Sequence, residues 1–443
     1  MMQFSDNSEK LPRKTLAPAL FAVHTICCCI SFVVVLQLYG YLHLFTWSSN
    51  RIYEAALLSL PIAALAIAMI FAKFSFGYLL SFYLYTVTLG YLWLTPFSQL
   101  GYDRKFPVIS AIASTAAFLA PALFLKWPIK IKPVVSIRGL HRLIAAIIVA
   151  TLAIIATGIF YNFKLVGLSD IYQFRDQLKF PTPLQYAMGI TLGALLPFAF
   201  ACCVEMRARL LAAATLLLCV ALYPVTLTKT ALFAPVWLCF LLLVSTYLEA
   251  RIAVIVSLLG PIAVGLVLAV LSSGGLISES LFLNYFGTIN FRMIAFPSVA
   301  IDVYNDFFSR HEITHFCQIS VLKHLMTCPY DEQLLLVISK NYPVGNMNAS
   351  LLATEGIASV GSAWAPASAL LAGLVLSVGN QTSEGLPPRF VILSSGMVAQ
   401  AFLNVPLTVL MVTNGTALLF LLWYIIPRLP FAGASEAGFK ARV

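Results

Sequence analysis

Residues 141–162 read HRLIAAIIVATLAIIATGIFYN, and from Leu143 to Phe160 this stretch contains no charged side chain. Apolar runs of roughly 18 residues or more are typical of membrane-spanning helices, because a helix of that length crosses the hydrocarbon core. A strand of a transmembrane barrel would alternate apolar and polar residues, and this run does not. The stretch therefore predicts one transmembrane α-helix.

The same pattern recurs along the 443-residue chain, which is 60% hydrophobic and 10% charged. A soluble protein carries about 25% charged residues, so this composition is too poor in charge to form a water-facing surface. Because lipid offers no hydrogen-bond partners to the backbone, helices and closed barrels are the structures that span a bilayer. The expected fold class is all-α, a polytopic transmembrane bundle of about twelve spans, with apolar runs at 16–39, 54–72, 76–97, 106–127, 141–162, 182–203, 210–226, 229–248, 251–272, 350–378, 391–412 and 414–427.

Lysine and arginine residues set the expected orientation. Sixteen of them fall in segments that are cytoplasmic if the N-terminus is inside, against seven in the short outside loops. This is the positive-inside bias, and it accounts for the net charge of +10 without a nucleic-acid partner. The chain then divides into spans one to nine (1–271), a large extracytoplasmic loop (272–349) and spans ten to twelve (350–443), with both termini cytoplasmic.

The expected loop 272–349 holds most of the unusual polar chemistry of the chain. A loop of this length is uncommon without structure or function of its own, and we expect short helices lying on the membrane over 296–307 and 319–326. Cys317 and Cys328 share the loop. They are compatible with a disulfide, if the loop faces an oxidising compartment, and equally with two free thiols.

Residues 311–315, His-Glu-Ile-Thr-His, match the pattern H-E-x-x-H. On a helix the two histidines would share one face and bind zinc, with the glutamate as general base of a metalloprotease. Two β-branched residues inside the string, and the lack of an obvious third ligand beyond Glu332 or Glu355, argue against that hypothesis. We expect no bound metal and no cofactor, and a direct role for His311 or His315 in binding phosphate or sugar.

Three cations and one carboxylate outside the span interiors are further candidates. Arg175 presents a planar fork of donors suited to phosphate, although a basic residue beside a bilayer is also a common membrane anchor. Lys229 occupies a tight turn between two spans, where it could instead reach lipid headgroups. Arg292 is a second phosphate ligand or the partner of a nearby aspartate. Glu355 lies at the outer edge of a span, where a carboxylate needs a partner.

These features resemble the Wzy-type oligosaccharide repeat-unit polymerases and, more distantly, the O-antigen ligases. The resemblance lies in the number of spans, the two large outside loops (163–181 and 272–349), the stretch 172–175, the turn 228–230, Arg292 and the passage 348–361. It implies a glycosyltransferase of the bacterial inner membrane whose active site faces the periplasm. The implied substrates are two undecaprenyl-diphosphate-linked oligosaccharides, a donor and an acceptor. The implied partners, besides the lipid bilayer, are a chain-length regulator and a flippase.

On this chain the resemblance implies that arginines in the two large loops hold the anionic substrate. Glycosyl transfer from a lipid diphosphate places negative charge on the leaving group, and fixed cations stabilise that charge without a metal. An acceptor hydroxyl also needs a group that positions or deprotonates it. The expected catalytic residues are Arg175, Arg292 and His315, and the expected substrate-binding residues are Tyr172, Lys229, His311, Asn348 and Glu355.

Other functions remain open on the sequence. A ligase of the same architecture would transfer glycan to a different acceptor. A lipid-linked sugar transporter should carry ionisable residues at bilayer mid-depth, and the span interiors here are nearly free of charge. A mannosyltransferase-like enzyme would place a catalytic acid in the first outside loop, where Glu54 is the available carboxylate. The zinc protease is the remaining alternative.

Overall fold

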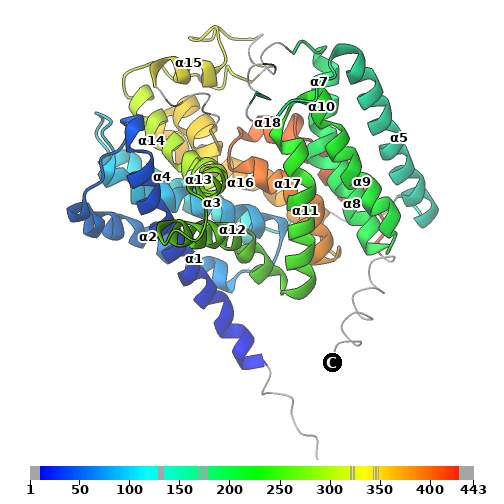
Figure 1. The fold of residues 1–443 in the computed structure, drawn as a ribbon, viewed down its shortest axis with the longest axis horizontal. Helices are drawn as coiled ribbons and strands as arrows, with labels where there is room; N and C mark the ends of the chain where they lie inside the picture. Colours follow the sequence, from blue (N-terminus) through cyan, green and yellow to red (C-terminus); the bar gives the residue numbers. More distant parts are fainter. Residues whose placement is uncertain are drawn as a thin grey trace, which may run out of the picture. The chain divides into compact units, whose positions relative to one another are not determined.

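The computed structural model describes residues 10–127, 134–167, 170–171, 174, 178–319, 322, 325–342, 344, 347 and 349–428. Within these residues the regular structure is helical (Figure 1), and the only β-type pairing is an isolated antiparallel bridge between Phe45 and Ser98. The all-α class expected from composition and run length is confirmed.

The elements are labelled in chain order, with η for both 3-10 and π segments. They are α1 (Lys10–Leu38), η1 (Gly40–Leu42), η2 (Ser49–Arg51), α2 (Ile52–Phe71), α3 (Phe76–Leu94), η3 (Thr95–Phe97), α4 (Lys105–Phe124), α5 (Ile137–Tyr161), α7 (Thr182–Ile190), η4 (Thr191–Leu195), α8 (Leu196–Glu205), α9 (Arg209–Ala221), α10 (Tyr223–Thr226), α11 (Lys229–Tyr247), α12 (Ala250–Ser273), α13 (Glu279–Phe286), η5 (Gly287–Ala295), α14 (Phe296–Phe308), α15 (Leu334–Asn341), η7 (Leu352–Ala358), α16 (Ser359–Thr382), α17 (Pro388–Phe402), α18 (Leu407–Val412) and α19 (Thr416–Ile425).

The chain is a multi-pass membrane protein by the length and composition of its helices. Large apolar side chains face outward on several of them, such as Phe160 on α5 and Leu210 on α9, which are 89% and 88% exposed. Contact between such side chains and lipid costs no free energy, whereas their contact with water is unfavourable. Nine helices in the described part of the chain are long and apolar enough to span a bilayer: Leu16–Leu38, Ser49–Phe71, Lys105–Phe124, Ile137–Tyr161, Thr182–Glu205, Arg209–Thr226, Lys229–Tyr247, Ala250–Ser273 and Leu352–Thr382.

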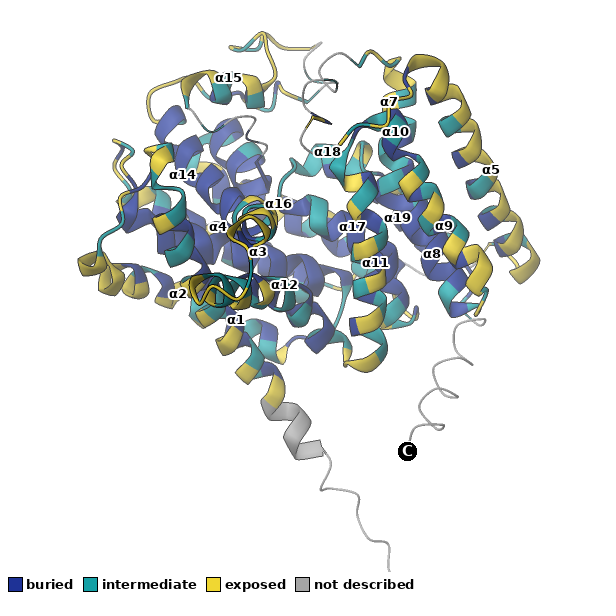
Figure 2. Ribbon diagram, in the orientation of Figure 1, coloured by how far each residue is buried: buried dark blue, intermediate teal, exposed yellow. Residues whose placement is uncertain are grey.

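Three apolar runs, at 76–97, 391–412 and 414–427, also form helices, but these helices are not among the nine candidate spans. The helix α3 is 19 residues long and buried along its whole length (Figure 2), so it contacts protein instead of lipid. The final two runs are divided among α17, α18 and α19. Pro406 is the residue immediately before α18, and Gly415 adopts a left-handed conformation (φ 77°) before α19, which together explain the breaks.

Two compact units make up the chain, and each combines segments that are distant in sequence. Unit 1 contains Met1–Phe74, Tyr78–Phe124 and Arg251–Leu374, and unit 2 contains Ser75–Gly77, Leu125–Ala250 and Val375–Val443. The division expected from the sequence cuts the chain into consecutive segments after residues 271 and 349. The spatial division is interleaved, because helices from both ends of unit 1 pack on one another.

Residues 279–308, expected to open a long loop, instead form a continuous helical segment made of α13, η5 and α14. The helix expected over 296–307 is confirmed as α14, but it is buried inside unit 1 (Figure 2) and does not lie on the membrane surface. Asn290 Nδ2 donates to Ser31 Oγ of α1 at 2.9 Å, and Ser298 Oγ donates to the Val87 carbonyl of α3 at 2.8 Å. The segment 319–326 falls partly on residues outside the described part.

Local sequence explains where this helical segment begins. The Ser278 hydroxyl accepts a hydrogen bond from the amide of Leu281, which is the usual N-cap contact. Glu279 places a negative charge in the first turn, where it complements the positive end of the helix dipole. Pro297 sits near the start of α14, after the π-helical turns of η5, and the helix ends at Phe308.

Unit 2 contains its own buried ion pair. Glu205, at the end of α8, accepts two hydrogen bonds from Arg389, from Nε at 2.8 Å and from a terminal nitrogen at 2.9 Å. The Glu205 side chain is 2% exposed. A planar guanidinium that binds a carboxylate through two nitrogens fixes both orientation and distance, so this pair holds α17 against α8.

Candidate functional site

The residues expected to form a site are divided between the two units. Lys229 is the first residue of α11 in unit 2, and Arg292, His311, His315 and Glu355 belong to unit 1. Three further candidates, namely Tyr172, Arg175 and Asn348, lie outside the described residues. The expected convergence of Arg175 and Arg292 therefore stays a prediction.

Arg292 projects from the π-helix η5 and is exposed, whereas Asn290, Ile294 and Ala295 of the same segment are buried. Its guanidinium carbon lies 3.9 Å from the centre of the Phe296 ring, which is cation–π geometry. The neighbouring Phe291 stacks on Tyr39, just beyond the end of α1, at 3.8 Å. Phe291, Phe296 and Tyr39 also line a narrow apolar hollow, together with Val35, Leu36, Leu42, Leu44, Phe45, Val299 and Val344. The Arg292 cation therefore lies beside this apolar hollow.

The segment 311–315 is not helical. It follows the end of α14 as a bend and a stretch without regular structure, and His315 and Phe316 adopt left-handed backbone angles (φ 48° and 66°). The amide of Thr314 donates to the Ala358 carbonyl at 2.7 Å, which ties the segment to the end of η7. The geometry that would place both histidines on one helix face is therefore missing. Among the described residues, no group of three His, Cys, Asp or Glu side chains could hold a metal.

The imidazole of His311 is held in a defined orientation. Its ring stacks on Phe307 with the ring centres 4.0 Å apart and the planes 5° from parallel. Its Nδ1 lies 2.8 Å from the Phe307 carbonyl oxygen. A carbonyl can only accept, so Nδ1 carries the proton of the neutral ring and Nε2 is its acceptor. His311 is thereby suited to receive a proton or a hydroxyl hydrogen bond, and His315 lacks such an orientation among its described contacts.

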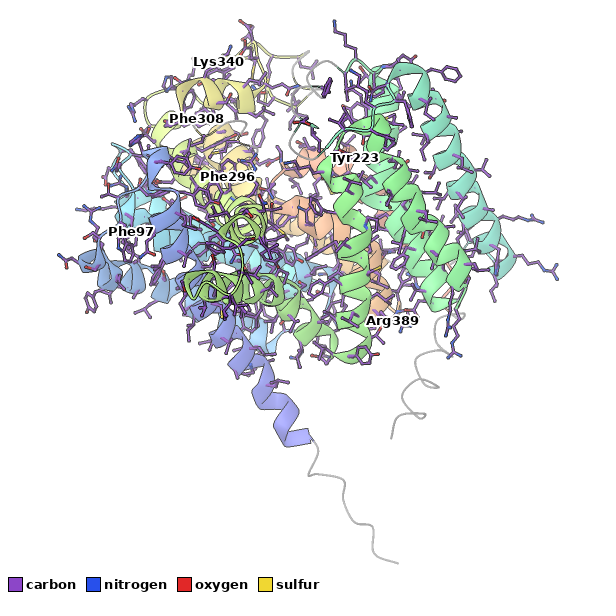
Figure 3. The ribbon with its side chains drawn as sticks, viewed as in Figure 1. Phe97, Tyr223, Phe296, Phe308, Lys340 and Arg389 are labelled. Carbon is purple, nitrogen blue, oxygen red and sulfur yellow. A yellow bond between two sulfur atoms is a disulfide. The ribbon has the colours of Figure 1, made fainter. Side chains whose placement is uncertain are left out.

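Arg292 and the two histidines lie at opposite ends of α14, whose first and last residues, Phe296 and Phe308, are labelled in Figure 3. Helical residues rise about 1.5 Å each, so Arg292 and Phe308 are roughly 24 Å apart along the helix. Arg292 and His315 were expected to act together in catalysis. The chain turns after Phe308 on its way to His315, so joint action of Arg292 and His315 stays a prediction.

Glu355 lies on the second π-helix of unit 1, η7, and is 7% exposed. Its carboxylate accepts a hydrogen bond from the Thr354 hydroxyl. Burial raises the pKa of Tyr304 on α14, and the negative charge of Glu355 raises it further, so the two side chains are close. π-Helical segments within α-helices are frequent at functional sites. Arg292 and Glu355 both occupy π-helical segments.

Two aspartates on α14 were not among the expected site residues. Asp302 is 2% exposed and accepts hydrogen bonds from the Ser98 hydroxyl at 2.6 Å and from the Tyr102 hydroxyl. Burial raises the pKa of Asp302, and the two hydroxyl donors and the guanidinium of Arg104 act in the opposite direction. Tyr102 also has a raised pKa, first through burial and then through the charge of Asp302, so it remains a donor.

Asp306 lies one helical turn further along and is also 2% exposed. It accepts from the Tyr342 hydroxyl at 2.6 Å and from the Gly101 amide at 3.2 Å, and it pairs with Arg310. The sequence signal for this pair was present: two carboxylates spaced i, i+4 in an otherwise apolar helix must share a face and need partners.

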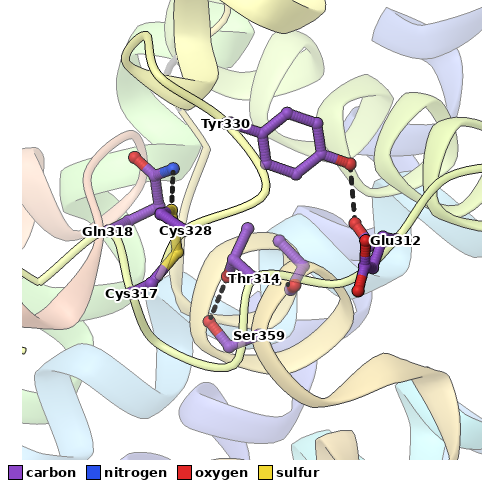
Figure 4. Close-up of a disulfide and its surroundings, with 8 residues drawn as sticks. Glu312, Thr314, Cys317, Gln318, Cys328, Tyr330 and Ser359 are labelled. Carbon is purple, nitrogen blue, oxygen red and sulfur yellow. Dashed lines mark hydrogen bonds between the residues drawn. A yellow bond between two sulfur atoms is a disulfide. The ribbon is translucent and has the colours of Figure 1, made fainter. Parts of the chain in front are cut away.

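The disulfide left open by the sequence is present between Cys317 and Cys328 (Figure 4). Cys317 is fully buried, and Gln318 contacts the other sulfur. The Thr314 hydroxyl contacts Ser359 in the same view, so the cross-linked turn lies against the junction of η7 and α16.

Unit 1 therefore offers an exposed cation beside an apolar hollow at one end of α14, and an oriented imidazole with buried carboxylates at the other. The first can bind an anionic headgroup, and the second can accept hydrogen bonds or protons. Comparisons of the chain with protein-family models, with curated proteins and with solved structures find no match.

Proposed function

We propose that this protein is a polysaccharide polymerase of the Wzy type, which transfers lipid-diphosphate-linked oligosaccharide repeat units onto a growing chain. The observation that carries the proposal is Arg292, an exposed guanidinium beside the apolar hollow lined by Tyr39, Phe291 and Phe296. A lipid diphosphate combines an apolar tail with an anionic headgroup. The guanidinium, with its planar fork of donors, suits the headgroup, and the apolar side chains beside it would contact the first carbons of the tail.

The proposed location is the extracytoplasmic face of the bacterial inner membrane. Two independent features support it. The Lys/Arg asymmetry favours an outside position for the segment after α12. The Cys317–Cys328 disulfide belongs to the same segment, and disulfides persist in oxidising compartments such as the periplasm.

In the proposed reaction the hydroxyl oxygen of an acceptor sugar attacks the anomeric carbon of the donor. The bond between that carbon and the diphosphate oxygen breaks, and the electron pair leaves with the diphosphate. The hydroxyl proton passes to a base. A cation fixed at the diphosphate lowers the barrier because the charge there grows towards the transition state. Arg292 supplies one such cation in the proposal.

Polymer length in a deletion strain tests this function. Loss of the gene should leave single repeat units, and wild-type protein should restore the polymer. Arg292→Ala should reduce polymerisation about a hundredfold, because removing one charge-stabilising donor costs about 3 kcal/mol. Arg292→Lys should rescue poorly, since an ammonium group does not reproduce the planar fork.

The matched control is Arg209→Ala. Arg209 is an exposed arginine at the start of α9, on the side expected to be cytoplasmic, and its loss should leave polymer length unchanged. Protein abundance is measured for every variant. Full-length polymer from Arg292→Ala at normal abundance would exclude the assigned role of Arg292. Unchanged polymer in the deletion strain would exclude the function itself.

A further inference from the structure

An aromatic cluster lies just beyond the end of α14. Phe308, His311 and Tyr330 surround the buried Phe307, and we refer to these three as the aromatic platform. The Tyr330 ring centre is 6.0 Å from that of Phe307 and 6.3 Å from that of Phe308, with the latter pair edge to face at 89°. His311 is exposed, and Phe308 and Tyr330 are half-buried. The platform therefore presents aromatic surface to the outside of unit 1.

The platform is held rigidly by contacts of its own. The stacking on Phe307 and the bond to its carbonyl fix the His311 ring. The Tyr330 hydroxyl donates to the Glu312 carbonyl at 2.6 Å (Figure 4). Cys328, two residues before Tyr330, is cross-linked to Cys317. Rings that are already ordered lose little conformational entropy when a ligand binds, which favours binding.

Charged groups border the platform. Arg310, His311 and Glu312 are consecutive and exposed, and the Arg310 side chain is 59% exposed while it pairs with Asp306. Together they provide guanidinium donors, a carboxylate acceptor and an imidazole acceptor. Such a border can hydrogen-bond a ligand that is rich in hydroxyl groups.

We propose that the aromatic platform binds sugar residues of the glycan substrate that lie several rings away from the lipid diphosphate. One face of a sugar ring carries mainly C–H groups and packs on an aromatic ring, while its hydroxyls reach the bordering charged groups. The platform is roughly 24 Å from Arg292 along α14. A sugar attached directly to a diphosphate at Arg292 is too close to that residue to reach the platform. The proposal takes its substrate from the proposed function.

Direct binding tests the platform. The full-length protein is purified in lipid nanodiscs and titrated calorimetrically with the host strain's repeat-unit oligosaccharide, released from its lipid by mild acid. This probe has no diphosphate, so it reports on sugar contacts alone. Tyr330→Ala and His311→Ala should each weaken binding about tenfold, as the loss of one aromatic contact predicts. Tyr330→Phe keeps the ring and should retain most of the affinity.

The matched control is Tyr53→Ala on α2, a tyrosine of unit 1 that is 74% exposed and should not affect binding. The proposal that the platform binds sugar would be overturned if wild-type protein did not bind the oligosaccharide, or if the alanine variants bound it as wild type does. Polymer loss in Arg292→Ala alongside that result would leave the polymerase proposal standing. If binding depended on the platform but polymer length were unchanged in the deletion strain, the glycan-binding proposal would stand and the polymerase proposal would be excluded. A variant that loses a co-purifying membrane protein but keeps its oligosaccharide affinity would identify a protein-docking surface instead.

Discussion

The bond between Tyr342 and Asp306 should hold the segment that follows the disulfide against α14. Tyr342→Phe removes this single donor and keeps the ring. The hydroxyl lies 2.6 Å from an oxygen of Asp306, whose side chain is 2% exposed. Burial raises the pKa of Tyr342, and its bond to Asp306 raises it further, so at neutral pH the hydroxyl is protonated and donates. Removing it leaves Asp306 with the Gly101 amide and Arg310.

The size of the effect follows from the type of bond. A hydrogen bond to a charged group contributes about 1.5–3 kcal/mol, and the half-buried position of Tyr342 places this one near the lower limit. About 1.4 kcal/mol corresponds to a factor of ten in an equilibrium constant. The segment ending in α15 should therefore detach from α14 about ten times more often in the variant.

Hydrogen exchange measured by mass spectrometry, on full-length protein in nanodiscs, follows the amides of α15 (Leu334–Asn341). They should exchange about tenfold faster in Tyr342→Phe. Tyr285→Phe is the matched control, because it removes a hydroxyl bond to the Pro261 carbonyl at 3.1 Å elsewhere in unit 1. Equal α15 exchange in wild type and Tyr342→Phe would show that other contacts hold the segment and would refute the reasoning.

Three further outcomes are expected. Burial raises the pKa of Asp302, so the folded state holds the carboxyl proton more strongly than the unfolded state, and stability is lost as pH rises from about 4 through the raised pKa. Thermal melts should show this loss in wild type and not in Asp302→Asn, and equal pH profiles of the two proteins would contradict the expectation. Reporter fusions should be cytoplasmic after residue 135 and extracytoplasmic after residue 325, and a cytoplasmic signal at 325 would overturn the orientation and the mechanism. Purified protein should contain no stoichiometric zinc, and zinc that disappears in a His311→Ala, His315→Ala double variant would restore the metalloprotease hypothesis.

The fold class was predictable because it depends on quantities that are local in sequence. The uncharged stretch in 141–162 became α5, and the run at 251–272 became α12. The position of α14 was not predictable in the same way. Its aspartates read as polar loop residues, because the hydroxyls that satisfy Asp302 belong to Ser98 and Tyr102, 204 and 200 residues earlier in the chain.

The candidate site shows the same limit. His311 was selected from the H-E-x-x-H string and Glu355 as a carboxylate at the edge of a span, and both belong to unit 1. The H-E-x-x-H string matched a helical pattern, whereas the helix ends before it and His315 has a left-handed backbone. The π-helical turns that carry Arg292 and Glu355 have no sequence signature that we could use. The aromatic platform was missed because Tyr330 meets Phe308 through the disulfide-linked turn and not through helical spacing.

The interleaving of the two units has a consequence for biosynthesis. The connection between α3 and α4 bonds to Asp302, which is made about 200 residues after it. Ribosomes add about 5–20 residues per second, so this connection waits roughly 10–40 seconds for its partner. Throughout that interval the hydroxyls of Ser98 and Tyr102 lack their carboxylate, while residues of unit 2 are inserted. We expect newly made chains to be vulnerable to membrane quality-control proteases until α14 arrives, and a chain that stops before residue 302 to be degraded and not to accumulate as half a protein.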